Sequence, residues 1–217
     1  MFTKDVLLFL SELEVNNNRE WFQLQKERYK LNIETPFFEF ITELIELLNK
    51  EGAAIKGNAK DCIFRIYRDV RFSKDKSPYK NHLSALLSKG GRKDFLNPGL
   101  YIELTADHLK IYSGLYEPSK DQLDKIRNKI IKNLDTFQAL YKAKKFKNTY
   151  NSILGSKAKR IDKKYNAYLE KEPLLLNKSF YYVNELESDI ILTKKLNQKV
   201  VEAYRAATDI NEFLSIN

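Results

Sequence analysis

The sequence predicts an α+β fold, with a small antiparallel sheet in the central third packed with N-terminal and C-terminal helices. Two observations lead to this class. Apolar residues recur every three or four positions in the first and last thirds, which is the period of an amphipathic helix. The middle third changes to the two-residue alternation of strands. A single domain is expected over residues 1–217, helical over 1–52, sheet-rich over 60–116 and helical over 118–217.

Three helices are expected in the first third. Thr3 can cap the first helix, and Asn18, the last of three consecutive asparagines, can cap the second. Thr35 and Pro36 predict a third start, because a cap is followed there by proline at the first helical position. Gly52 is expected to end this helix. Its apolar stripe consists of Phe37, Phe40, Ile41, Leu44, Ile45 and Leu48.

Short strands are expected in the middle third. They are residues 62–67, 83–87, 100–104 and 109–115. The last two flank a turn at 106–108 and are predicted to pair as an antiparallel hairpin. Residues 73–80 carry turn residues around Pro78 and are predicted to form a loop.

The last third is expected to be helical again. Pro118 is predicted to open one helix and Asp135 to cap another. Residues 142–172 are basic and irregular, which is typical of a surface loop with some helix. A closing helical region is expected over 192–214.

Composition excludes several classes of protein. Apolar residues make up 43% and charged residues 31% of the chain, which is typical of a folded globular protein. No apolar run approaches the roughly 20 residues of a membrane span, and the first residues lack the features of a signal peptide. A single cysteine, Cys62, excludes an internal disulfide and a multi-cysteine zinc site, and two histidines are too few for a His-rich metal centre. We therefore expect a cytoplasmic protein with no metal site; the sequence leaves both the cofactor and the oligomeric state undefined.

The charge is positive and uneven. The formal net charge is +9, and such an excess attracts anions such as nucleic acid or nucleotides. Residues 65–80 hold six basic and two acidic residues, and residues 142–164 hold nine basic and one acidic residue. A basic face is expected if these two segments meet in space.

The central motif runs from Phe64 to Lys80 and reads Phe-Arg-Ile-Tyr-Arg-Asp-Val-Arg-Phe-Ser-Lys-Asp-Lys-Ser-Pro-Tyr-Lys; we call it the signature. Three further segments accompany it: Asn17–Phe22, Ser113–Pro118 and the pair Ile126-Arg127. Together they resemble the domain of unknown function 2461 family, a group of bacterial conserved hypothetical proteins, over most of the chain. The stretch 155–173 departs from the family pattern. The resemblance implies no known activity, cofactor or substrate, and it alone suggests that Asn17 and Arg19 reach the signature.

Our preferred hypothesis is that the signature binds a small ligand bearing phosphate or carboxylate. Arginine grips such groups with two parallel hydrogen bonds, and lysine adds point charge. The candidate ligand-binding residues are Arg65, Arg68, Arg71, Lys74, Lys76, Tyr79 and Lys80. Tyr67 and Tyr79 could stack on a base or hydrogen-bond a ligand.

Two alternatives involve the same residues. In a phosphoryl or phosphodiester enzyme, Asp69 and Asp75 could hold a metal or act as a base, with His82 as a general acid. In a purely structural network, the arginines would neutralise carboxylates of the fold, for example Arg68 with Glu103, and Asp69 would cap a turn or pair with Arg71.

A third alternative is nucleic-acid binding through both basic segments, which we favour less because no known nucleic-acid module is present. In residues 142–164 and just beyond, cations are interleaved with aromatic rings, a pattern that suits single strands. These rings belong to Tyr141, Phe146, Tyr150 and Tyr165.

Overall fold

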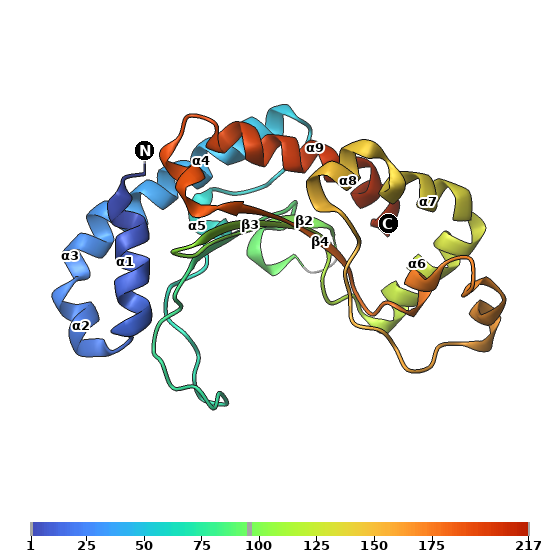
Figure 1. Cartoon of the computed structure of the whole chain (residues 1–217), viewed down its shortest axis with the longest axis horizontal. Coiled ribbons are helices and arrows are strands. Elements are labelled where there is room, and N and C mark those ends of the chain that lie inside the picture. Colours follow the sequence, from blue (N-terminus) through green and yellow to red (C-terminus); the bar gives the residue numbers. More distant parts are fainter. Residues whose placement is uncertain (1, 95–96, 217) are drawn as a thin grey trace. The chain divides into compact units, whose positions relative to one another are not determined.

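The computed structural model describes residues 2–94 and 97–216 and divides into two compact units. Unit 1 contains the described residues of 1–92, 101–111 and 185–201. Unit 2 contains those of 93–100, 112–184 and 202–217. Figure 1 shows the course of the chain through helices and strands, and the class is α+β as predicted. None of the helices in the described ranges combines the length and apolarity that crossing a membrane requires.

Unit 1 begins with a helical run that is interrupted only briefly. Its elements are α1 (Lys4–Val15), α2 (Arg19–Leu24), α3 (Lys26–Arg28), a π-helical segment (Tyr29–Glu34), α4 (Thr35–Lys50) and α5 (Ala59–Cys62). Asn18 caps α2 as predicted, since its Oδ1 accepts from the Trp21 N–H at 2.9 Å. Thr3 occupies the N-cap position of α1 without a capping hydrogen bond from its side chain. The predicted cap at Thr35 is wrong: the π-helical segment joins α3 to α4, and the Thr35 hydroxyl donates to the Lys30 carbonyl.

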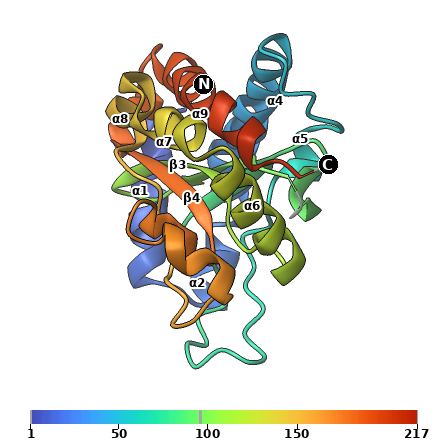
Figure 2. The ribbon, with the colours of Figure 1, turned by 90° about the vertical axis from the view of Figure 1, so that its right-hand side faces the viewer.

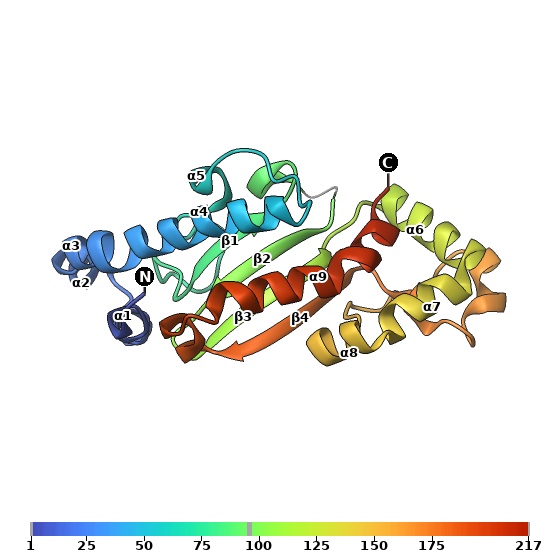
Figure 3. The same cartoon turned by 90° about the horizontal axis from the view of Figure 1, so that it is seen from above.

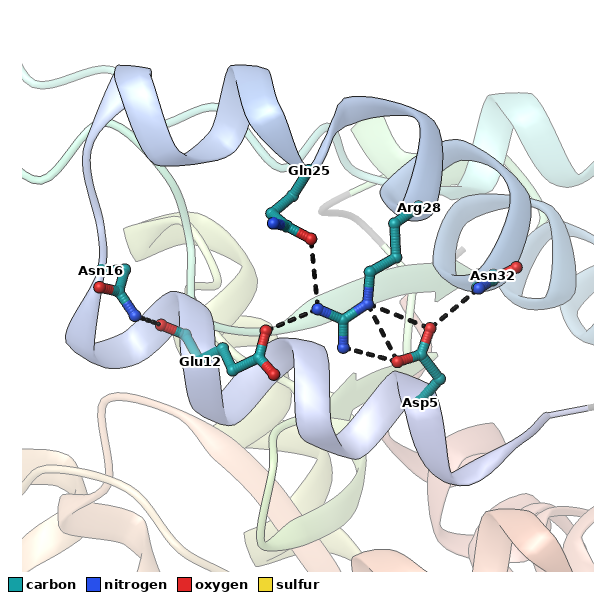
Figure 4. Close-up of polar contacts among 6 residues, drawn as sticks. All are labelled: Asp5, Glu12, Asn16, Gln25, Arg28 and Asn32. Carbon is teal, nitrogen blue, oxygen red and sulfur yellow. Dashed lines mark hydrogen bonds and ion pairs between the residues drawn. The ribbon is translucent and has the colours of Figure 1, made fainter.

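A half-buried guanidinium fastens α1 to α3 (Figure 4). Arg28 forms ion pairs with Asp5 at 2.5 Å and with Glu12 at 2.6 Å, and Asn32 donates to the same Asp5 carboxylate. Hydrogen bonding from Arg28 lowers the pKa of Asp5 below its usual range. Because Asp5 and Glu12 lie two turns apart on α1, one side chain fixes the axial position of that helix.

The sheet has four strands in the order β1-β2-β3-β4 and is antiparallel. They are β1 (Leu83–Leu87), β2 (Gly99–Leu104), β3 (His108–Leu115) and β4 (Phe180–Glu187). Burial alternates strictly along β2 and β3, so that one face joins the core and the other is partly exposed. In unit 1, α4 packs against β1 and lies along the buried face (Figures 1 and 3).

Two predictions about strands are wrong. Residues 62–67 form no regular strand: α5 ends at Cys62, and isolated bridges join Ile63 to Ala85 and Tyr67 to Tyr79. Local polar groups favour the helical turn, because Asn58 begins it with a capping box and Arg92 donates to the carbonyls of Lys60 and Ile63 at its end. The second error is β4, which lies inside the stretch 118–217 that was predicted to be helical.

Unit 2 contains the remaining longer helices. They are α6 (Lys120–Lys132), α7 (Leu134–Lys142), α8 (Lys144–Tyr150) and, from residue 202 onward, most of α9 (Leu196–Leu214). The cap of α6 is Ser119, which forms a capping box with Gln122 one residue after the predicted start. Asp135 lies in the first turn of α7, and Asn133 occupies the N-cap position, so the predicted cap at Asp135 is wrong. Short 3₁₀ turns at Lys163–Tyr168 and Pro173–Leu176 follow α8.

Two local contacts in unit 2 depend on single residues, Gly114 and Arg127. Gly114 in β3 has a φ of +95°, and a Cβ placed there would lie 2.2 Å from the carbonyl oxygen of Phe180 in β4. Arg127 in α6 is 6% exposed; its Nε donates to the Leu175 carbonyl at 2.8 Å and its Nη2 to the Asn177 carbonyl at 3.2 Å. Both residues belong to segments that accompany the signature in the sequence.

Candidate anion-binding site

The signature forms two antiparallel arms and a projecting loop in unit 1. The Lys80 N–H donates to the Ile66 carbonyl at 2.8 Å, and the Arg68 N–H donates to the Pro78 carbonyl at 2.9 Å. Beyond these bonds, residues 69–77 form a loop that extends away from the sheet on the side opposite α4 (Figures 1 and 2). The predicted turn residues around Pro78 therefore lie in the returning arm and the end of this loop.

Asn17 clamps the returning arm to the start of α2. Its Nδ2 donates to the Tyr79 carbonyl at 3.0 Å, and the Tyr79 N–H donates back to its Oδ1 at 3.1 Å. Phe22 stacks on the Tyr79 ring, with centroids 4.0 Å apart and planes at 16°. The prediction that Asn17 reaches the signature is confirmed, and Arg19 is close enough to act electrostatically on the Tyr79 hydroxyl. The Tyr79 ring is buried by these contacts.

Replacing Asn17 with alanine is expected to lower the free energy of unfolding by about 2 kcal/mol, because two hydrogen bonds to a buried backbone segment are lost. Urea denaturation followed by circular dichroism measures the change. Asn16→Ala is the matched control, since the Asn16 amide makes one local bond, to the Glu12 carbonyl at 2.8 Å, and less than half the effect is expected. Equal losses in the two variants would contradict the clamp.

Both arginines of the loop are paired with carboxylates of the same loop. Arg68 pairs with Asp75, and Arg71 pairs with Asp69 at 2.7 Å. Lys76 donates to the Val70 carbonyl at 3.0 Å. The predicted pairing of Arg71 with Asp69 is confirmed, whereas the predicted pairing of Arg68 with Glu103 is wrong, because Asp75 is the closer carboxylate within the same loop.

Both aspartates of the loop are held in the ionised form. Hydrogen bonding from Arg71 lowers the pKa of Asp69 to about 2. The pKa of Asp75 is lowered by the Ser77 hydroxyl and N–H and then by Arg68. A carboxylate that is exposed and already bonded in this way is a weak base at neutral pH. In the chain as described, no three His, Cys, Asp or Glu side chains gather to hold a metal ion.

A second group of signature residues lies on the partly exposed face of the sheet. Lys80 places its Nζ 5.1 Å from the centre of the Phe64 ring, and that ring lies 6.0 Å from Tyr101 of β2. Burial, and then the positive charge of Arg65, lower the pKa of Lys80. Arg65 and Lys80 therefore lie close enough together to repel each other.

His82 and Glu103 lie beside the two cations. The Nε2 of His82 is 4.0 Å from the Glu103 carboxylate, and the two side chains are 23% and 21% exposed. Burial lowers the pKa of His82, so that the neutral imidazole predominates at pH 7. The pKa of Tyr101, in contrast, is raised by burial. The arrangement thus combines two cations, a neutral imidazole, a carboxylate and a phenol.

The two groups of cations differ in one respect. Each arginine of the loop has its own carboxylate, whereas neither Arg65 nor Lys80 lies within 4 Å of a carboxylate in the described ranges. The signature therefore divides into a loop whose arginines are paired with its own carboxylates and a cation pair, Arg65 and Lys80, on which Glu103 acts only at longer range. Lys74, the remaining candidate, is exposed on the loop.

Sequence reasoning missed Tyr101 and Glu103 as members of this cluster. The alternation of β2 places both on the face opposite Leu100 and Ile102, and this signal was present in the sequence. Their position next to Lys80 and His82 depends on the order of the strands in the sheet, which could not be predicted from the sequence.

Most aromatic rings of the second basic segment, residues 142–164 and just beyond, are buried in the structure, whereas binding of a single strand requires exposed rings. Phe146, Tyr150 and Tyr165 are buried, and the Tyr141 hydroxyl bonds to the Glu172 carboxylate at 3.0 Å. The three buried rings are not accessible for stacking on bases. The exposed lysines of α8 remain as a solvated surface in unit 2, whereas the signature belongs to unit 1.

The chain matches the family described as conserved hypothetical protein (DUF2461) over residues 5–213, and it belongs to this family. No curated protein matches the chain. The signature and the segments that carry Asn17, Gly114 and Arg127 all lie within the matched range.

Proposed function

We propose that the protein binds a small ligand bearing phosphate or carboxylate through Arg65 and Lys80, on the partly exposed sheet face of unit 1. The observation that supports this proposal is the cation pair without a carboxylate partner. Lys80 is half-buried next to the exposed Arg65; the two like charges repel each other, and an anion between them would relieve the repulsion. The Arg65 guanidinium supplies a bidentate fork and the Lys80 ammonium a point charge.

The other candidate residues have a supporting role in this proposal. Arg68 and Arg71 maintain the loop through Asp75 and Asp69, and Tyr79 fixes the returning arm from which Lys80 projects. His82 then offers a hydrogen-bonding group to the rest of the ligand. Lys74 and Lys76 add positive potential around the site.

A thermal-shift series at low salt tests the proposal. The probes are inorganic phosphate, nucleoside monophosphates, sugar phosphates and dicarboxylates, and a ligand at 100 times its Kd should raise the Tm by several degrees. We expect Arg65→Ala and Lys80→Met to abolish the shift. Arg71→Ala is the matched control, because its guanidinium is already paired with Asp69, and it should retain the shift.

Two results would overturn the assignment. Retention of the shift in Arg65→Ala together with its loss in Arg71→Ala would move the site to the loop. Absence of a shift with every probe would leave the cation pair as a purely structural feature. Affinity should also fall as the pH rises through the lowered pKa of Lys80, since only the ammonium form attracts an anion.

Acid–base chemistry is a second candidate function at the same site, favoured by the contact between His82 and Glu103. A neutral imidazole can accept a proton from water or from a ligand hydroxyl. If the protein turns over the ligand found above, His82→Ala should reduce the rate at least a hundredfold while ligand binding persists. Unchanged turnover would remove His82 from the chemistry.

We also infer a cytoplasmic location. The chain has one cysteine, Cys62, which is buried and unpaired, and burial raises the pKa of its thiol. An inert free thiol is compatible with a reducing compartment.

A further inference from the structure

The loop of the signature exposes an aromatic ring at its tip. Phe72 is 96% exposed, the largest exposed fraction among the large hydrophobic side chains that the structure describes. It lies midway along residues 69–77, the part that extends furthest from the sheet in Figures 1 and 2. At this exposure the Phe72 ring adds nothing to the core, and its face is open to stack on a ligand.

The loop is internally bonded. Asp69 accepts from the Arg71 N–H at 3.3 Å and from its Nε at 2.9 Å, and Asp75 accepts from the Ser77 N–H at 2.9 Å. The Ser73 N–H donates to the Val70 carbonyl at 3.4 Å, which closes the turn that contains Phe72. These bonds hold the turn in shape, and none of them involves the Phe72 ring.

One cation lies beside this ring, and another follows it closely in the sequence. The Arg71 guanidinium lies 5.8 Å from its centre, and the exposed Lys74 follows two residues later. A second exposed ring, Tyr67, lies on the outgoing arm and is 51% exposed. Exposed rings alternating with cations are the arrangement by which proteins stack on bases and contact phosphates at the same time. A membrane surface fits less well, because a single apolar side chain next to Asp69 and Asp75 offers little area for insertion.

We propose that the tip of the signature loop binds single-stranded nucleic acid, with Phe72 stacking on a base and with Lys74 contacting the phosphates. This interaction is separate from the anion site at Arg65 and Lys80. Loss of a stacking ring weakens binding about tenfold or more per base, and loss of a phosphate contact reduces the salt dependence of binding.

Fluorescence anisotropy of the full chain with labelled 12-nucleotide oligo-dT and oligo-U tests the proposal across a salt series. We expect Phe72→Ser to weaken binding about tenfold with an unchanged salt slope, and Lys74→Gln to reduce the magnitude of the slope by about 0.7. Phe38→Ser is the matched control, since Phe38 is another exposed ring, 41% exposed on α4, and its loss should change affinity less than twofold. Because Phe72 packs on no core, the Tm of Phe72→Ser should equal that of the unmodified chain.

Three outcomes would overturn the proposal. The first is the absence of oligonucleotide binding at 20 mM salt. The second is binding that Phe72→Ser and Phe38→Ser reduce equally. The third is binding confined to vesicles containing phosphatidylserine and dependent on Phe72, which would identify the loop as a membrane contact. Arg65→Ala should leave oligonucleotide affinity within twofold, so that this test is independent of the anion site.

Discussion

Gly114→Ala is expected to lower the free energy of unfolding by about 4 kcal/mol or more, or to prevent folding. Two costs add at this position. The φ of +95° disfavours any side chain, and the new Cβ would lie 2.2 Å from the Phe180 carbonyl oxygen and 3.0 Å from the Tyr181 Cα. Both are backbone atoms of the neighbouring strand, so a rotamer change cannot relieve the clash, and β3 and β4 would have to separate.

The Gly52→Ala variant separates the effect of the positive φ from the effect of the steric clash. Gly52 has a similar φ of +87°, but a Cβ there would meet no atom within 4 Å. Gly52→Ala should therefore lower the free energy of unfolding by only about 1 kcal/mol, because only the backbone conformation is disfavoured. Chemical denaturation of both variants measures the difference. Similar losses at the two positions would show that Gly114 is constrained by its dihedral angle and that β3 and β4 can accommodate a methyl group.

Arg127→Met is expected to lower the free energy of unfolding by about 3 kcal/mol. The guanidinium is buried, and two carbonyls at the end of the Pro173–Leu176 turn depend on it for hydrogen bonds. Methionine preserves much of the side-chain volume, so the loss reports mainly on the unpaired carbonyls.

The matched control for Arg127 is Arg160→Met. Arg160 is exposed on the same unit, and its replacement should change stability by no more than about 0.5 kcal/mol. Urea denaturation of both variants at pH 7 gives the comparison. A loss below about 1 kcal/mol for Arg127→Met would mean that water replaces the guanidinium, and that the turn is less well packed than its burial indicates.

Local patterns predicted much of the fold. The hairpin of β2 and β3 was predictable because alternation and turn residues act over neighbouring positions, and Asn18 was predictable as a cap for the same reason. The predicted strand at 62–67 failed because Arg92, 29 residues from Ile63, stabilises a helical turn there. β4 was missed because its alternation covers only the first half of the strand, where it meets the core.

The cations of the site could be predicted from the sequence, but which of them are paired with carboxylates could not. The sequence identified the cations, and it suggested Glu103 as an example of a carboxylate that could pair with Arg68. The actual loop turns Arg68 toward Asp75, and Glu103 lies beside His82. Which cations keep a free charge depends on these pairings, and pairings follow from the path of the backbone rather than from residue spacing.

The clamp at Asn17 also has a consequence for local unfolding. Since the Tyr79 amide proton is bonded to a side chain at the start of α2, it becomes accessible to solvent only when that bond opens. The returning arm and the N-terminal helices then form one cooperative unit, in which Lys80 stays in place for as long as α2 is folded. A disturbance of the first 25 residues would accordingly reach the sheet face without any change in the strands themselves.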